Sequence, residues 1–212
     1  MLKKYKGTLI LTSLVALLPI LVGLILWNRL PEQVAMHWNA QGEVDGWAAK
    51  WVAVFGMPLF TVAIQWLCLL VTAIEPKSKN VEGKPLQLVL WICPFISVLV
   101  CGITYLTALE IPVSVEIIMP MVLGAMFMLI GNYMPKCRQS YTLGIKTPWA
   151  LEDEENWYST HRFAGRLWMV GGALCIVASL FGFVLFFAIV LVMAFAPMIY
   201  SYLYYRKKHR EE

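Results

Sequence analysis

Charged residues are scarce in this sequence. Only 14% of its 212 residues are Asp, Glu, Lys or Arg, 60% are hydrophobic, and the mean hydropathy is +0.69. Soluble domains average about 25% charged and about 45–50% apolar residues. The composition therefore excludes an ordinary soluble domain and predicts an integral membrane protein. The net charge of +4 does not indicate direct binding of nucleic acid, because its placement follows from membrane topology.

Motifs of catalysis and metal binding are also missing. The cysteines show no CxxC or other metal-ligand spacing and most lie in apolar runs, so we predict no structural disulfide, metal site or cofactor. No nucleophile elbow, HExxH motif or phosphate-binding loop occurs. His161 beside Thr160, and His37 with Asp45, are the nearest approaches to an acid–base group. We therefore predict that the protein is not an enzyme.

Apolar runs that are long enough to cross a bilayer, about 20 residues each, fill most of the chain. The last run is too long for one helix, and Phe181-Gly182-Phe183 is the natural place for a tight hairpin within it. We therefore predict an all-α, polytopic membrane protein with six transmembrane helices. The runs are residues 8–27, 51–74, 86–109, 115–134 and 164–205.

The basic residues predict the orientation. Only Arg29 and Lys50 lie on one side of this layout, so 15 of the 17 Lys and Arg (17 minus 2) mark the other side as cytoplasmic. Both termini are then cytoplasmic. Residues 1–114 form a three-span half with an outward loop, 28–50, and residues 115–212 form a second three-span half with a cytoplasmic loop, 135–163. This order resembles the inverted repeats of transporters, although no residue-level match between the halves supports a repeat.

The cytoplasmic loop holds most of the residues capable of chemistry. Thr147 and Pro148 are typical of a helix start, since Thr is a good N-cap and Pro fits the first helical position. The acidic run 152–155 then falls in the first turns of that helix. From Trp157 the spacing is helical and places His161 on the same face. One interpretation is an amphipathic helix at the membrane surface with solvated charges.

The outward loop combines turn residues with aromatic and polar side chains. Residues 34–47 are predicted to form a small hairpin, and Asp45-Gly46 is a turn dipeptide. The tryptophans fit an interfacial aromatic belt. The polar residues His37, Asn39, Glu43 and Asp45 are open to three interpretations. They form a sparse cation site, a turn that satisfies its own backbone, or a surface that contacts an extracellular peptide.

Both loops resemble a known family. Residues 131–136 (GNYMPK), 143–151 (LGIKTPWAL), Trp157 and 160–165 (THRFAG) resemble the signature of SdpI-type membrane proteins. Leu30-Pro31, residues 36–39 (MHWN), Gly42, Asp45-Gly46 and Lys50 resemble an uncharacterised domain often found in front of that signature. The founding member of the family protects its bacterial producer against a secreted killing peptide, the sporulation-delay toxin. When it meets the toxin, it also holds a helix-turn-helix repressor at the membrane.

The resemblance implies a multi-pass immunity and signalling protein of the bacterial cell membrane. Its implied partners are the lipid bilayer, an extracellular peptide toxin and a cytoplasmic repressor. The ligand-binding residues expected in the outward loop are His37, Trp38, Asn39, Gly42, Asp45 and Trp47. The signature residues expected to act in the cytoplasm are Asn132, Pro135, Gly144, Lys146, Thr147, Pro148, Trp149, Trp157, His161 and Arg162.

Other interpretations stay open at this point. The chain could be a transporter or exporter of a peptide or a lipid-like substrate, although the absence of central charged residues from the spans disfavours ion-coupled transport. Arg162 and Arg166 could pair with lipid phosphates. Lys146 and Arg162 could instead anchor the acidic run 152–155 and fix the loop against the membrane.

Overall fold

The computed structural model describes residues 2–210, which are mostly helical. The chain divides into two compact units. The first contains residues 1–74 and 82–115, and the second contains residues 75–81 and 116–212. Each unit is built from long apolar helices, which satisfy their own backbone hydrogen bonds and are therefore the structures that suit a bilayer.

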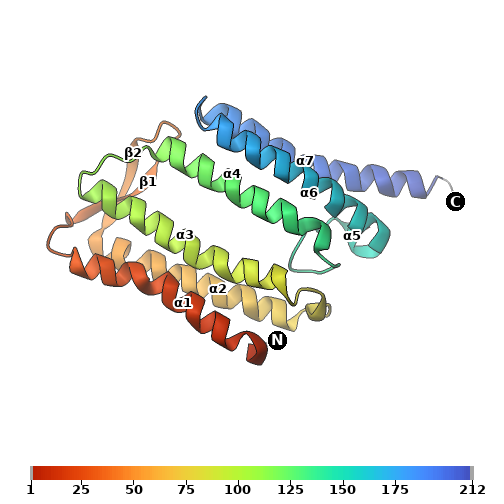
Figure 1. Cartoon of the computed structure of the whole chain (residues 1–212), viewed down its shortest axis with the longest axis horizontal. Helices are drawn as coiled ribbons and strands as arrows, with labels where there is room; N and C mark the ends of the chain where they lie inside the picture. The colour runs from red at the N-terminus through yellow and green to blue at the C-terminus, as the bar shows by residue number, and fades with distance from the viewer. Residues whose placement is uncertain (1, 211–212) are drawn as a thin grey trace. The chain divides into compact units, whose positions relative to one another are not determined.

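Three helices form the first unit, and they run side by side with a two-stranded hairpin at one end (Figure 1). They are α1 (Leu2–Ile25), α2 (Met57–Ile74) and α3 (Lys84–Ala108). A π-helical turn, Val52–Gly56, leads into α2. The strands are β1 (Gln33–Trp38) and β2 (Val44–Ala49).

Hydrogen bonds from buried side chains join the three helices of this unit. Gln65 on α2 donates to the Thr12 hydroxyl on α1, and Ser97 on α3 donates to the Ala16 carbonyl at 2.7 Å. The Tyr105 hydroxyl donates to the Pro19 carbonyl at 3.0 Å, and it lies where a Cβ on Gly23 would approach it to 2.6 Å. Such bonds bring specificity to a lipid-embedded bundle, where apolar contacts discriminate weakly.

The second unit contains α4 (Val115–Tyr133), a 3₁₀ turn (Met134–Lys136), α5 (Pro148–Glu152), α6 (Glu154–Ala178) and α7 (Phe183–Lys208). α6 and α7 form a long helical hairpin (Figure 1). Its turn ends at Gly182, whose φ of +102° favours glycine. The expected tight hairpin around Phe181-Gly182-Phe183 is therefore confirmed.

Glycines set the approach of α4 to α6. A Cβ on Gly131 would lie 2.9 Å from the Gly165 carbonyl oxygen, and a Cβ on Gly124 would lie 2.6 Å from that of Gly172. Both pairs are too close for any side chain, as expected where transmembrane helices pack through small residues.

Five helices are long and apolar enough to cross a membrane among the described residues, whereas the sequence predicts six spans. The five candidates comprise residues 3–25, 52–74, 84–108, 115–136 and 183–208. The difference between the predicted and the candidate spans is α6. It starts as a polar helix at Glu154 and carries Arg162 and Arg166, and the apolar part after Arg166 is shorter than the roughly 20 residues needed. The sixth span and the side on which the termini lie stay predictions.

Candidate functional site

The start of the loop that carries the signature, residues 135–163, is fixed by two buried polar residues. The Gln139 amide donates to the carbonyls of Ala150 and Leu151 at 2.9 and 2.7 Å. The Ser140 hydroxyl accepts from the backbone N–H of Thr142 and Leu143 at 3.0 and 3.1 Å. Because both side chains bond backbone groups of their own loop, they set its path.

A short segment, residues 75–81, is tied to this part of the loop. The buried Glu75 carboxylate accepts from the Ser140 hydroxyl at 3.0 Å and from the Tyr141 N–H at 3.0 Å. Asn80 donates to the Gln139 carbonyl at 2.8 Å, and the Lys77 ammonium donates to the Gln139 side chain. The loop is thus held by charge-assisted bonds, which are stronger than neutral ones.

Gly144, Trp157 and His161 form a tightly packed group. Gly144 has φ of +112°, and a Cβ there would lie 2.5 Å from His161 Nε2 and 2.8 Å from the Trp157 ring. The two rings stack with centroids 4.0 Å apart, and the Trp157 indole N–H donates to the Cys137 carbonyl at 2.9 Å. Glycine is therefore required at 144 both by the backbone and by the space available.

His161 is held neutral by its surroundings. The ring is fully buried; its Nδ1 lies 2.8 Å from the Trp157 carbonyl and its Nε2 accepts from the Ile145 N–H at 3.0 Å. The proton is therefore assigned to Nδ1. Burial lowers the pKa of His161 to about 4, against the smaller opposing effect of the bond to the Trp157 carbonyl. Because both ring nitrogens are engaged, this histidine has no free atom for acid–base chemistry.

A buried chain of polar groups joins the signature to α7. The Thr147 and Ser201 hydroxyls are 2.7 Å apart, and Ser201 donates to the Asn156 side-chain oxygen at 2.9 Å. That oxygen also accepts from the Thr160 hydroxyl at 2.9 Å, and the Asn156 amide donates to the Ser201 carbonyl at 3.0 Å. Thr147 accepts from the Ala150 N–H as the N-cap of α5, which confirms the expected helix start.

The acidic run is divided between two helices, which corrects the expectation of one continuous helix from Pro148. α5 ends at Glu152, and the Asp153 side chain accepts from the Glu155 N–H to cap α6. Lys208 pairs with Asp153 at 2.8 Å and Glu155 at 3.2 Å, so the anchoring cation is on α7 and is neither Lys146 nor Arg162. Burial acts to raise the pKa of Asp153, but the bonds from Lys208 and the backbone lower it overall.

The remaining signature residues lie on the surface. Trp149 is half-buried, with its ring centroid 5.1 Å from that of Tyr202 on α7. The signature residues with exposed side chains are Asn132, Pro135, Lys146, Pro148 and Arg162, and Gly144 is exposed as well. The signature therefore has a buried part that positions the loop and an exposed part that is available for contact.

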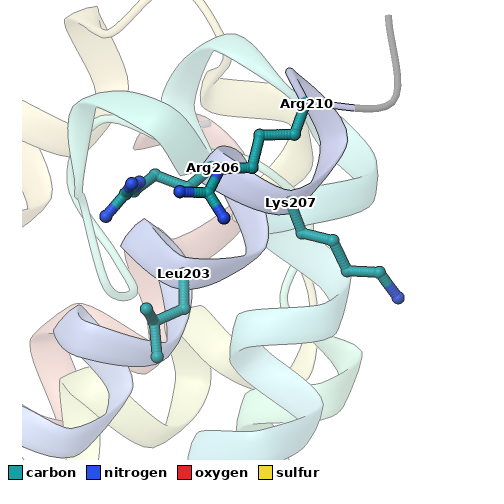
Figure 2. Close-up of a pocket in the computed structure, with 4 residues that line it drawn as sticks. All are labelled: Leu203, Arg206, Lys207 and Arg210. Carbon is teal, nitrogen blue, oxygen red and sulfur yellow. The ribbon is translucent and has the colours of Figure 1, made fainter.

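A shallow basic hollow lies at the end of α7. It is lined by Leu203, Arg206, Lys207 and Arg210. Figure 2 shows Lys207 extending away from the side of α7 on which Arg206 and Arg210 lie. Lys and Arg in the last turn of a helix also suit the negative end of its dipole.

The other candidate site is the hairpin of the first unit, residues 28–50, whose expected strands are confirmed. β1 and β2 pair antiparallel, and Val34 on β1 is buried. His37 Nδ1 lies 2.5 Å from Asp45 Oδ1, and the side chains are 72% and 45% exposed. A Cβ on Gly46, which lies opposite His37, would approach the His37 Cβ to 2.9 Å. The pair therefore lies open on the surface.

Asn39 shapes the tip of this hairpin. Its side-chain oxygen accepts from the N–H of Gln41 and Glu43 at 2.9 and 3.0 Å, and its amide donates to the Glu43 carboxylate at 3.0 Å. Gly42 has φ of +80°, as a tight turn requires. Of the three interpretations of these polar residues, Asn39 thus fits the turn that satisfies its own backbone.

The two hairpin tryptophans differ in exposure. Trp38 is half-buried, whereas Trp47 is 60% exposed. Trp47, His37 and Asp45 are therefore the expected ligand-binding residues that present accessible side chains, while Asn39 and Gly42 are committed to the turn.

Several residues that hold the second unit together were not singled out from the sequence: Glu75, Gln139, Ser140, Asn156 and Ser201. Ser201 had one detectable signal, because it is a lone small hydroxyl residue in an otherwise apolar and aromatic run. Glu75 and Gln139 had none, since their partners are remote in sequence or are backbone groups.

Comparisons with known proteins match two segments of the chain, one for each polar loop. Residues 136–201 match the SdpI/YfhL protein family, and residues 14–62 match a domain of unknown function, DUF1648. The Immunity protein SdpI of Bacillus subtilis (strain 168) is 26% identical over 207 residues, which cover 93% of this chain and 96% of that protein. No solved structure gives a significant match.

The family matches fall on the two segments from which the resemblance was drawn, and the apolar helices agree with a multi-pass protein of the bacterial cell membrane. The chain is therefore similar to the SdpI-type membrane proteins over most of its length, with a DUF1648 segment in front of its SdpI/YfhL segment.

Proposed function

We propose that this protein protects a bacterial cell against a secreted antimicrobial peptide of the sporulation-delay type. The observation that carries the proposal is its similarity to the Immunity protein SdpI over 93% of the chain. The similarity includes both polar loops, which fall within or overlap the two matched family segments. No catalytic step is part of the proposal, and the enclosed His161 supports that choice.

The proposed topology has six spans, both termini in the cytoplasm, and halves at residues 1–114 and 115–212. The bias of Lys and Arg supports it. In this arrangement the hairpin 28–50 faces outward and the signature loop 135–163 faces the cytoplasm.

The outer surface of the hairpin is the proposed contact for the peptide. His37 and Asp45 offer an exposed polar pair, and Trp47, two residues along β2 from Asp45, offers an exposed aromatic ring. Aromatic residues around a polar centre are typical of protein interfaces. Trp38 adds half-buried aromatic surface, and Asn39 and Gly42 hold the turn that presents the group.

On the cytoplasmic side, the exposed part of the signature is the proposed contact for a repressor. Lys146 and Trp149 lie on the surface of the loop, and Arg206 and Lys207 lie on the end of α7. A partner with acidic side chains fits this charge. Binding of the peptide outside would bias the packing of the spans and so change the position of the signature loop.

The test is survival. The chain is expressed in a sensitive bacterium, which is then challenged with the sporulation-delay peptide. Intact protein should protect the cells, and His37→Ala with Trp47→Ala should remove protection at an equal amount of membrane protein. The matched control is Trp51→Ala, because Trp51 is exposed to a similar degree, 62%, and lies outside β2.

Each result has a distinct meaning. Full protection by the hairpin variant would refute recognition at this surface. No protection by the intact chain, with the protein present in the membrane, would refute this peptide as the ligand and favour export of another substrate. In a second assay, a helix-turn-helix protein from the same locus carries a fluorescent tag. Its toxin-dependent recruitment to the membrane should be lost in Lys146→Ala with Trp149→Ala.

A further inference from the structure

Two arginines lie on the face of α6 that is apolar further along the helix, from Val170 to Val177. Arg162 and Arg166 are exposed, and so are Val170, Leu174 and Val177, which follow at intervals of four, four and three residues. This spacing places all five on one side of the helix. In the proposed six-span topology the exposed apolar side chains of α6 face lipid, so the two arginines on the same side face lipid as well.

The opposite side of α6 is filled by protein. Gly165 and Gly172 touch the α4 backbone, and the Trp168 indole donates to the Met193 carbonyl on α7 at 2.9 Å. Within residues 2–210, the ion pairs of the acidic run belong to Lys208, and neither Arg162 nor Arg166 forms an ion pair with a carboxylate. The two guanidinium groups therefore have neither room nor a charged partner inside this unit.

The pairing of α6 with α7 shows how deep in the bilayer the two arginines lie. Phe163 stacks on Tyr200 at 4.6 Å, and Trp168 reaches Met193, so Arg166 lies level with a point between those two α7 residues. That point is about 9 to 20 Å along α7 from Arg206, at about 1.5 Å per residue. Because Arg206 begins the basic end of α7, Arg166 lies on the hydrocarbon side of the headgroups.

We propose that Arg162 and Arg166 form a binding site for the phosphate of an anionic phospholipid, such as phosphatidylglycerol. The guanidinium groups extend along α6 toward the headgroups and draw the phosphate inward, as lipid-facing basic residues do by snorkelling and local thinning of the bilayer. Arg is suited to phosphate because its donors form a planar fork. The apolar surface from Val170 to Val177 then contacts the acyl chains of the same lipid.

The test uses the delipidated full chain in detergent with added dioleoylphosphatidylglycerol, and native mass spectrometry counts the lipids that stay bound. Arg162→Gln with Arg166→Gln should weaken lipid retention about 30-fold, because each basic residue near an anionic lipid contributes about fivefold and the two contributions multiply. The control Lys79→Gln with Arg138→Gln removes the same charge from exposed positions elsewhere in the unit and should retain the lipid. Arg162→Lys with Arg166→Lys should retain an intermediate amount.

Other outcomes would overturn the proposal. Equal retention by the arginine variant and the control variant would show that the lipid binds through net charge alone. Equal binding of dioleoylphosphatidylcholine would remove the selectivity for an anionic headgroup. Displacement by millimolar glycerol 1-phosphate would assign the site to a soluble phosphate. Tryptophan fluorescence of each variant checks that the fold is intact, and Arg162→Gln alone gives a milder test at a single exposed position.

Discussion

Replacement of Gly144 by alanine should destabilise the second unit strongly. The new Cβ would lie 2.5 Å from His161 Nε2 and 2.8 Å from the Trp157 ring, and φ at this position is +112°. A strained backbone costs about 1–3 kcal/mol, overpacking about 1–3 kcal/mol, and loss of the bond from Ile145 N–H to His161 about 1–3 kcal/mol. The expected loss of unfolding free energy is therefore about 3–7 kcal/mol, since the three effects overlap.

Gly182→Ala is the matched control. Gly182 has a similar φ, +102°, but nothing lies within 4 Å of a Cβ built there. Only the backbone strain of about 1–3 kcal/mol should appear. The free energies are measured by titrating each detergent-solubilised variant with a denaturing detergent and following circular dichroism. Equal destabilisation by the two substitutions would refute the claim that contact with His161 and Trp157 fixes this glycine.

Three further predictions concern His161, Ser201 and His37. The pKa of His161 is lowered to about 4 from 6.5, so the unfolded state binds more protons than the folded state between these pH values. Stability should therefore fall by about 3 kcal/mol as pH drops from about 6.5 to about 4. Thermal unfolding across this range should depend less on pH for His161→Gln than for the intact protein, and an unchanged pH profile would contradict the assignment. Ser201→Ala removes a donor to Asn156 and should lower the free energy of unfolding by about 1–3 kcal/mol. Ser179→Ala should lower it less, because the Ser179 hydroxyl bonds only the Ile176 carbonyl of its own helix. The same denaturing titration checks this ranking. His37→Ala breaks an exposed pair worth about 0–1 kcal/mol, so its thermal midpoint should barely change, and a large drop would make any loss of protection a folding effect.

The regular elements were largely predictable because their causes are local. The apolar run 51–74 predicted α2 together with the π-helical turn before it, and the run 86–109 predicted α3 nearly to its ends, since a chain in lipid must satisfy its backbone within each helix. Thr147 and Pro148 predicted the start of α5 through capping. The hairpin 34–47 followed from its turn residues. These signals need only the chemistry of neighbouring residues.

The contacts of the signature loop were not predictable, because each depends on a residue remote in sequence. Ser201 stands out in the sequence only as a lone small hydroxyl residue, and its partners Asn156 and Thr147 become apparent only when α7 packs against them. Glu75 belongs to a polar turn until the fold brings it to Ser140. The acidic residues Asp153 and Glu155 likewise gain their partner, Lys208, only when α7 packs beside α6.

The sequence by itself thus determined that this is a multi-pass, mostly helical membrane protein with two distinctive polar loops, because hydropathy and turn chemistry act over a few residues. Tertiary structure alone decided where each signature residue lies and what it contacts. It buried His161 and Trp157, left Lys146 exposed and Trp149 half-buried, and placed Arg166 on the exposed side of α6. Burial and depth depend on which helices pack together, and that is set by contacts between distant parts of the chain.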